Sequence, residues 1–252
     1  MAVRKAGRIV AAVAATALVA GGAAACGPED LTGGGDGKES ASASGSASAG
    51  GPEAKEPPAG TDALAKAPAT VKGGVITVGD PKAGHTVKLY EDARCPICKK
   101  FEETGAQALV KPVAEGKVKV EYTLASFLDK NLGGSGSVNA ANALRASVDA
   151  GKFPQYHAAV FANQAEVETD DAYTPAFLLK IADQVDGLRG AGFDKAVRKG
   201  TYEKWVGEAM QAFTDDGMQG TPTVVIDGKK AESESLFDQS AFAEELKASG
   251  IS

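Results

Sequence analysis

The sequence is poor in side chains that bind metal ions. It contains only three cysteines and two histidines, His85 and His157, in 252 residues. A structural zinc site needs about four ligands, and neither histidine stands at a recognisable spacing from Cys95 and Cys98. We therefore expect no metal and no cofactor in this protein.

Basic runs are missing as well. The chain has 27 Lys and Arg against 33 Asp and Glu, which gives a formal net charge of -6. An acidic protein without a basic patch is a poor partner for the phosphate backbone of nucleic acids. We therefore predict that the protein does not bind nucleic acid.

Large apolar side chains are nearly absent between residues 27 and 69, where Gly, Ala, Ser and Pro are abundant. Such a segment cannot bury enough apolar surface to offset the entropy lost on ordering. We predict that residues 26–70 form a flexible tether. Residues 71–252 then remain as one folded domain of ordinary size.

The first 25 residues have the three-part layout of a secretory signal. Three basic residues precede the apolar run 9–20, and small residues follow up to Ala25. The apolar run is shorter than the about 20 residues of a comfortable membrane span. We predict that residues 1–25 are a cleaved signal peptide. Its removal takes away three positive charges and changes the formal charge from -6 to -9.

Cys26 would be the first residue after that cleavage. Three cysteines in an exported protein leave one unpaired, and lipidation of Cys26 would account for the odd one. The segment resembles a bacterial lipoprotein signal, although Ala23 stands where leucine is usual. We expect an exported protein that a lipid on Cys26 anchors to the outer face of the cytoplasmic membrane. Ordinary cleavage and soluble secretion are the alternative.

Two strand patterns and a helix pattern open the folded part. Residues 74–80 and 86–92 are β-branched or alternate apolar with polar side chains, which predicts strands. A helix should follow from Pro96, because proline suits a first helical turn. Residues 117–124 alternate again and predict the returning strand of a parallel β-α-β unit.

A helical block and a closing β-β-α unit follow. The block is predicted at about residues 127–217, and we assign its large side chains, Trp205 included, to core packing. Asp227-Gly228 predicts a two-residue hairpin, and Asp238 predicts the cap of a last helix. Four segments carry helical signals in the block: 138–151, 154–164, 174–187 and 201–217.

The motif Cys95-Pro96-Ile97-Cys98 fits a redox couple, half of a zinc site or a structural bridge. A bridge that closes so short a loop should stabilise the fold little. If Pro96 begins the helix, the Cys95 sulfur lies at a helix N-terminus, which favours a thiolate. Cys98, one turn further, should be more buried and suits a resolving thiol.

Four segments stand out: YEDARCPICKKFEE, NAANALRASVDAGKFPQYHAAVFANQ, FDKAVRKGTYEKWV and GTPTVVIDGK. Together they resemble the DsbA-like branch of the thioredoxin superfamily, over about residues 73–252. This resemblance implies an α/β thioredoxin fold, with βαβ and ββα halves and an all-helical insertion between them. It also implies a protein disulfide oxidoreductase that needs no cofactor.

The resemblance also assigns roles to individual residues. It implies that Cys95 attacks and that Cys98 resolves the mixed disulfide. It places a cis-proline, Pro222, opposite these thiols, and it implies that Thr221 helps to hold an extended substrate segment. Pro96 and Ile97 complete the predicted site.

Two positions depart from the family pattern. Relatives commonly carry a buried acid six residues before the nucleophilic cysteine, where this chain has Leu89, and we place Glu91 and Asp92 in the connecting loop. DsbA itself has histidine where this chain has Ile97, so we expect a weaker oxidant.

The two histidines receive no catalytic role at this point. We expect His85 to lie in an exposed loop, and His157 to serve packing or to lie at the surface.

The expected function is disulfide oxidation or exchange outside the cytoplasm. Its partners would be exported proteins with thiols or disulfides and an unidentified membrane redox protein. A thiol reductase or isomerase, for example in cytochrome maturation, is one alternative. A tethered binding module without catalysis is another.

Overall fold

The computed structural model describes residues 52–252 apart from residues 57 and 59. Its centre is a six-stranded sheet with the order β1-β2-β4-β3-β5-β6, in which β3 and β4 are parallel and the other pairs are antiparallel. The strands are β1 Ala69–Lys72, β2 Val75–Val78, β3 His85–Asp92, β4 Val118–Ala125, β5 Thr223–Ile226 and β6 Lys229–Lys230.

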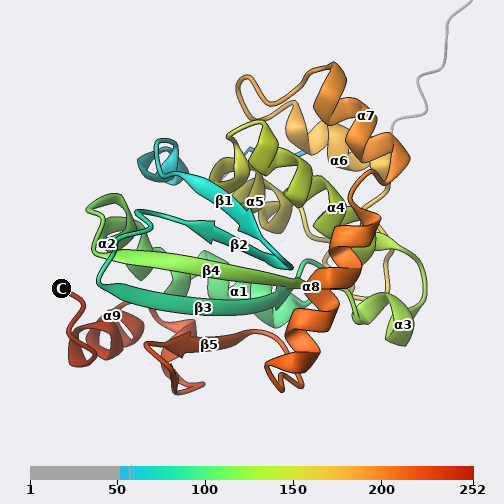
Figure 1. Ribbon diagram of the computed structural model, residues 1–252. Helices are drawn as coiled ribbons and strands as arrows, with labels where there is room; N and C mark the ends of the chain where they lie inside the picture. The colour runs from blue at the N-terminus through green and yellow to red at the C-terminus, as the bar shows by residue number, and fades with distance from the viewer. Residues whose placement is uncertain (1–51, 57, 59) are drawn as a thin grey trace, which may run out of the picture. The chain divides into compact units, whose positions relative to one another are not determined.

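Helices cover the sheet and form a separate block at one end of it (Figure 1). The predicted thioredoxin fold, with its βαβ and ββα halves and a helical insertion, is confirmed. The helices outside the insertion are η1 Thr61–Leu64, α1 Pro96–Glu103, η2 Gly105–Leu109, α2 Val110–Ala114, η3 Ser235–Phe237 and α9 Gln239–Ala248. The insertion contains α3 Leu128–Leu132, α4 Gly136–Asp149, α5 Phe153–Ala162, α6 Pro175–Ala182, α7 Ala191–Lys199 and α8 Glu203–Asp215.

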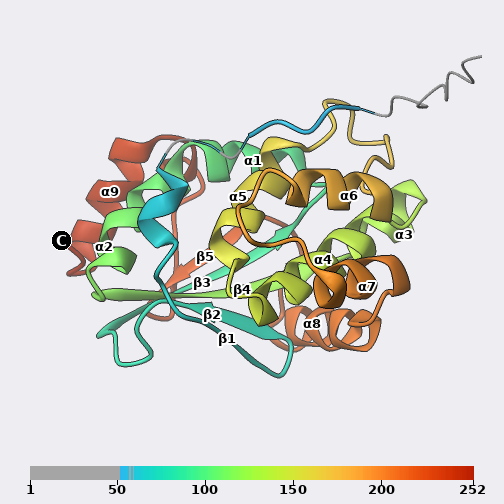
Figure 2. The same ribbon diagram turned by 90° about the horizontal axis from the view of Figure 1, so that it is seen from above.

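The two faces of the sheet pack against different helices. Alternate residues of β3 point to opposite faces, so Val87, Leu89 and Glu91 share one face. Figure 2 shows α1, α2 and α5 on one side of the sheet and α8 on the other. On the α8 side, the ring of Tyr90 meets Phe213 edge to face, with ring centroids 6.2 Å apart. The active-site helix α1 therefore rests on the face that carries Leu89 and Glu91.

The packed domain begins earlier than the predicted residue 71. The short helix η1 and strand β1 both precede that boundary or cross it. Ala54, Leu64 and Ala67 pack against the main hydrophobic core. Residues 1–51 lie outside the described part of the chain, and with them the predicted signal peptide, Cys26 and most of the predicted tether.

Capping side chains mark the starts of α6 and α9. The side chains of Thr174 and Asp238 accept hydrogen bonds from the main-chain N–H groups three residues further on, as N-caps do. The helix predicted to start at Thr201 begins instead at Glu203. The helix predicted from Pro96 ends at Glu103, and η2 follows from Gly105, where an added Cβ would lie 2.2 Å from the Leu236 carbonyl oxygen. Glycine at position 105 thus permits the close approach of η3.

In the part of the chain that the structure describes, no helix has both the length and the apolar character needed to cross a bilayer.

Candidate active site

The two thiols lie where β3 gives way to α1. Cys95 is the N-cap of α1, and Pro96 occupies the first helical position. The Cys95 sulfur accepts a hydrogen bond from the main-chain N–H of Cys98, over 3.3 Å. Both cysteines are free thiols. The geometry agrees with the expected thiol at a helix N-terminus.

Distant segments meet at the Cys95 sulfur. The Thr221–Pro222 peptide bond is cis. The Cys95 thiol donates a hydrogen bond to the main-chain carbonyl of Thr221, over 3.4 Å, across 126 residues of sequence. The structure therefore places Thr221 and Pro222 beside Cys95, as the resemblance implies.

An open groove of about 770 Å³ continues from the Thr221–Pro222 loop across the α8 side of the sheet. Tyr90 donates a hydrogen bond to Asp216 in this groove, over 2.5 Å. Its walls include Lys88, Tyr90, Asp216, Met218, Val225 and Lys230. The groove begins at Thr221, whose carbonyl contacts Cys95, the more accessible of the two thiols.

The two thiols differ in burial and in acidity. The hydrogen bonds from Cys98 outweigh partial burial and lower the pKa of Cys95 to about 7, with a further contribution from Thr221. Burial raises the pKa of Cys98 well above its usual value, and the neighbouring Cys95 and Glu91 raise it further. Cys98 is 0% exposed and Cys95 is 6% exposed. Cys95 is therefore suited to attack as a thiolate, while Cys98 holds its proton.

A buried acid lies beneath the thiols, although position 89 is leucine. Glu91 is part of β3 and is fully buried, so its predicted place in a connecting loop is wrong. Because side chains alternate along a strand, residue 91 faces the same side as residue 89. The buried acid of this chain therefore stands at position 91 instead of 89, two residues nearer to the cysteines along β3.

His157 and Glu102 complete a buried cluster with Glu91. His157 Nε2 hydrogen-bonds to Glu91 Oε1, and His157 Nδ1 lies 3.8 Å from Glu102 Oε2. His157 is 3% exposed, so of the two predicted places for it the structure excludes the surface. We call these three residues, Glu91, Glu102 and His157, the buried acid cluster.

Burial and charge set the protonation of this cluster. Burial raises the pKa of Glu102 to about 8, against the opposing effect of His157. Burial alone would lower the pKa of His157, but the charges of Glu91 and Glu102 outweigh burial and raise it to about 9. At neutral pH both Glu102 and His157 therefore carry a proton.

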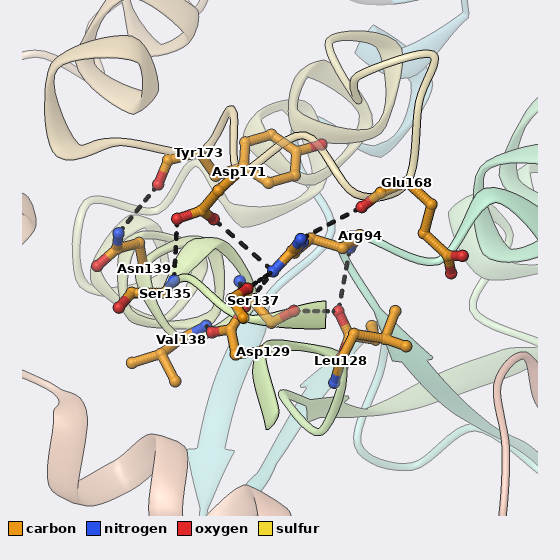
Figure 3. A network of polar contacts seen from close by, with 12 residues as sticks. Arg94, Leu128, Asp129, Ser135, Ser137, Val138, Asn139, Glu168, Asp171 and Tyr173 are labelled. Carbon is orange, nitrogen blue, oxygen red and sulfur yellow. Dashed lines mark hydrogen bonds and ion pairs between the residues drawn. The ribbon is translucent and has the colours of Figure 1, made fainter. Parts of the chain in front are cut away.

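Arg94 anchors the loops on the other side of Cys95 (Figure 3). Its guanidinium donates to Asp129 Oδ1 over 2.8 Å and to the carbonyl oxygens of Gly133 and Glu168. Asp171 Oδ1 lies 3.8 Å away. The Arg94 side chain is only 2% exposed. Its charge is thus paired with groups in the loops next to α3 and α6. Because Arg94 directly precedes Cys95, these contacts fix the loops beside the nucleophile.

Asp92 is also buried in β3, contrary to the predicted loop position. Its Oδ1 accepts hydrogen bonds from the Ser137 hydroxyl over 2.6 Å and from the Arg94 main-chain N–H over 3.0 Å. Burial raises its pKa to about 6 despite these bonds. Asp92 lies one residue from Glu91 and therefore points to the opposite face of the sheet.

The remaining polar neighbours position the backbone or lie at the surface. Gln164 donates to the main-chain carbonyls of Ala93 and Cys95. His85 begins β3 instead of lying in a loop, and it hydrogen-bonds to Asp227 over 2.7 Å. Ile97 is 49% exposed at the tip of α1, beside the thiols.

Sequence and structure comparisons agree with this geometry. A family model described as Thioredoxin matches residues 71–245, which is more than half of the chain. The chain belongs to the thioredoxin family. No curated protein matches it in sequence.

Solved structures of the thioredoxin fold are similar over most of this chain. Reduced DsbG from Mycobacterium tuberculosis is 23% identical with a TM-score of 0.58, and the match covers 77% of this chain and 93% of that one. Oxidised BdbD from Bacillus subtilis is 21% identical with a TM-score of 0.57, over 78% and 97% of the two chains. MdbA from Corynebacterium matruchotii, a thiol-disulfide oxidoreductase, is 23% identical with a TM-score of 0.57, over 69% and 92%.

Among the described residues, one group of three side chains has donor atoms close enough to surround a metal ion, within 4.8 Å of one another. This group is the buried acid cluster, and neither cysteine belongs to it. We assign no metal there, because His157 Nε2 is already engaged with Glu91 and the charges in the group balance one another.

Proposed function

We propose that this thioredoxin-family protein is a thiol-disulfide oxidoreductase that oxidises or exchanges disulfides in exported proteins. The observation that carries the proposal is the asymmetry of the CxxC pair. Cys95 has a pKa of about 7 and contacts Thr221, while Cys98 is buried and its pKa is raised. The named oxidoreductases among its structural neighbours support the same activity.

The oxidised pair would act through a mixed disulfide. A substrate thiolate attacks Cys95 Sγ, the Cys95–Cys98 bond breaks, and its electron pair leaves on Cys98 Sγ. A second substrate thiolate then attacks the substrate sulfur and releases Cys95 as a thiolate. The substrate loses two electrons and gains a disulfide, while the CxxC pair gains two electrons. The low pKa of Cys95 favours its departure.

The groove beside Thr221 suits the segment that flanks the substrate cysteine. Free main-chain groups near a cis-proline loop can pair with an extended peptide. Lys88 and Lys230 lie on neighbouring strands on either side of Val225. These lysines and Asp216 give the groove a polar wall. A protein substrate with an extended, polar segment fits this surface.

The helix N-terminus at Cys95 supports the oxidative direction that we propose. A dithiol form that carries a stabilised thiolate makes the pair a better oxidant. Ile97 adds no charge to that thiolate, so we expect a potential below that of DsbA. A reductase or isomerase role would require a more reducing pair, and a binding module would require no reaction at all.

Two measurements test the activity. The oxidised protein should form disulfides in a reduced, unfolded substrate, and the Cys95→Ser variant should not. Its reduction potential against glutathione should lie well above the thioredoxin value of about -270 mV. A potential near that value would contradict the proposed oxidase activity and favour a reductase. Absence of any exchange would favour the binding module.

We also propose that the protein is exported and that a lipid on Cys26 tethers it to the membrane. The support is the signal-like composition of residues 1–25 and the odd cysteine count. In bacterial expression, the wild-type protein should be found in the membrane fraction, and the Cys26→Ala variant in the soluble extracytoplasmic fraction. An unidentified membrane protein would then restore its disulfide. Equal distribution of both forms would contradict the lipid anchor.

A further inference from the structure

The turn between β3 and α1 carries Cys95 and is held from the end of α5. The main-chain N–H of Cys95 donates to the carbonyl of Asp92 over 2.9 Å, which closes a four-residue turn. Gln164 lies against this turn, and its Nε2 donates to the carbonyl oxygen of Ala93 over 2.7 Å and to that of Cys95 over 3.0 Å. Gln164 is 5% exposed. A buried side-chain amide thus bonds twice to the main chain beside the nucleophile.

A second side chain keeps Gln164 in place. Asn163 is the C-cap residue of α5 and is buried. Its Oδ1 accepts from the main-chain N–H of Lys55 over 2.6 Å, and its Nδ2 donates to the carbonyls of Lys55 over 2.9 Å and of Ala159 over 2.8 Å. Figure 2 shows the segment that contains Lys55, in blue, near α5. The end of α5 is therefore bound to a segment 108 residues away in sequence, which limits the movement of Gln164.

The contacts of Gln164 also fix the start of α1. The Cys95 carbonyl that Gln164 contacts accepts the Lys99 N–H over 3.2 Å, the first main-chain hydrogen bond of the helix. The main-chain N–H groups of Ile97 and Cys98 at this end of the helix help to lower the pKa of Cys95. Hydrogen bonds weaken steeply when donor and acceptor are misaligned. The stabilisation of the Cys95 thiolate therefore depends on how firmly this first turn is held.

The two redox states depend on this support to different extents. In the oxidised form, the bond between Cys95 and Cys98 fixes the two sulfurs covalently. In the structure both cysteines are free thiols, and only noncovalent contacts keep the Cys95 sulfur at the helix N-terminus. A contact that stabilises one of two states more than the other shifts the equilibrium by that difference. Gln164 should therefore favour the reduced form and make the pair a better oxidant.

We propose that Gln164 is a positioning residue for the redox pair, which holds the Cys95 turn so that the helix N–H groups stay aimed at the Cys95 thiolate. A substrate thiolate attacks Cys95 Sγ, and the electron pair of the broken disulfide leaves on Cys98 Sγ. A second substrate thiolate then attacks the substrate sulfur, and Cys95 leaves with the electron pair as a thiolate. Gln164 acts at this second step, through the main chain and without touching a reacting atom. This inference rests on the proposed function.

The test is the equilibrium of the full-length protein with reduced and oxidised glutathione, with a thiolate absorbance titration as the second readout. Gln164→Met keeps the length of the side chain and removes the donor. The cavity beside Gln164 has a volume of about 10 Å³, which is at the lower limit for one water molecule that could replace the amide. The equilibrium constant for reduction of the pair should fall about fivefold, the factor that one typical hydrogen bond contributes, and the pKa of Cys95 should rise.

Gln155→Met is the matched control. Gln155 lies on the same helix and is also buried, at 8% exposed. Its Oε1 has no hydrogen-bond partner among the described residues. This variant should leave the glutathione equilibrium and the pKa of Cys95 unchanged.

Two further measurements separate positioning from a general loss of stability. Gln164→Asn keeps an amide that is one methylene shorter and reaches at most one of the two carbonyls, so it should shift the equilibrium in the same direction. It decides the test if Gln164→Met does not fold. Urea unfolding of both redox forms should show that Gln164→Met destabilises the reduced protein more than the oxidised protein. A merely structural role would lower both stabilities equally.

The proposal is overturned if the folded Gln164 variants keep the wild-type equilibrium with glutathione and the wild-type pKa of Cys95. In that event the wild-type protein still exchanges its disulfide, so the proposed function stands. A wild-type protein that does not exchange with glutathione would instead contradict the proposed function.

Discussion

The surroundings of Cys95 and of Cys98 differ strongly, although the two side chains are chemically the same. On the Cys95 side lie the helix N-terminus, the Thr221 carbonyl and an open polar groove. On the Cys98 side lie the sheet and the buried acid cluster, whose Glu91 raises the pKa of Cys98. Two identical thiols three residues apart thus receive opposite shifts in pKa. The surroundings of each sulfur, and not the motif itself, therefore make Cys95 the attacking thiol and Cys98 the resolving thiol.

The largest predicted effect separates the two sides by function. Cys95→Ser should abolish disulfide transfer, because the accessible nucleophile is lost. Cys98→Ser should instead accumulate a mixed disulfide between Cys95 and the substrate, since no resolving thiol remains. Mass spectrometry after incubation with a disulfide-bonded peptide detects that adduct. An adduct that forms in Cys95→Ser would reverse the assignment.

The next prediction tests whether the charge of Arg94 helps Cys95 or only holds the loops. Arg94→Met removes a buried guanidinium and leaves the partly buried Asp129 without its cation, which should cost on the order of 3 kcal/mol of unfolding free energy. The pKa of Cys95 should change little in the folded variant, because the Arg94 guanidinium is bound to Asp129 and to loop carbonyls. Urea unfolding measures the stability, with Arg198→Met as the exposed control.

A large rise in the pKa of Cys95 in Arg94→Met would show that the Arg94 charge stabilises the thiolate directly. Unchanged unfolding would contradict its role as an anchor.

A third prediction concerns the exposed tip of α1. Ile97→His should stabilise the Cys95 thiolate and make the pair a stronger oxidant by about tenfold in its equilibrium with glutathione, or about 30 mV. The matched control is Val167→His, because Val167 is 55% exposed and Ile97 is 49% exposed. Equal reduction potentials in Ile97→His and Val167→His would show that position 97 does not set the oxidising strength.

A fourth prediction concerns the pH dependence of stability and tests the surroundings of Cys98. Glu102 has a pKa of about 8 in the fold against 4.5 for a free carboxyl group, so the native state holds a proton that the unfolded chain loses. Its contribution is complete below about pH 4.5 and is lost as pH rises through about 8. The stability should fall with a slope of up to about 1.4 kcal/mol per pH unit for this proton.

Glu102→Gln should flatten that slope between pH 5 and 8, and Glu103→Gln should not. Urea unfolding at a series of pH values measures both. The same slope in Glu102→Gln and wild type would show that Glu102 titrates normally in the folded protein.

Periodicity and motif chemistry predicted the strands from β2 to β6, the helical insertion and the place of the thiols, but not β1. The hairpin at Asp227-Gly228 followed from two residues, and both adopt positive φ values of 47° and 87°. These features depend on local backbone preferences, which the sequence carries directly. They required no knowledge of which elements meet in space.

The buried acid cluster depends on tertiary contacts and escaped prediction. The alternation along β3 puts Glu91 on the same face as Leu89, so a signal for the moved acid was present. The spacing of Phe153, His157 and Phe161 likewise places the histidine in an apolar helical stripe. Only the packing of α5 against β3 shows that these two charges pair. The early start of the domain was missed for the same reason, since Leu64 packs against distant core residues.

The most direct test of the different surroundings is a thiolate absorbance titration of the reduced protein. Wild type should show one thiolate that forms near pH 7, and this transition should vanish in Cys95→Ser and persist in Cys98→Ser at a somewhat higher pH, because the hydrogen bonds from Cys98 contribute. The second thiolate should form only at strongly alkaline pH. A single transition near the free-cysteine value of about 8.5 for both thiols would contradict the account.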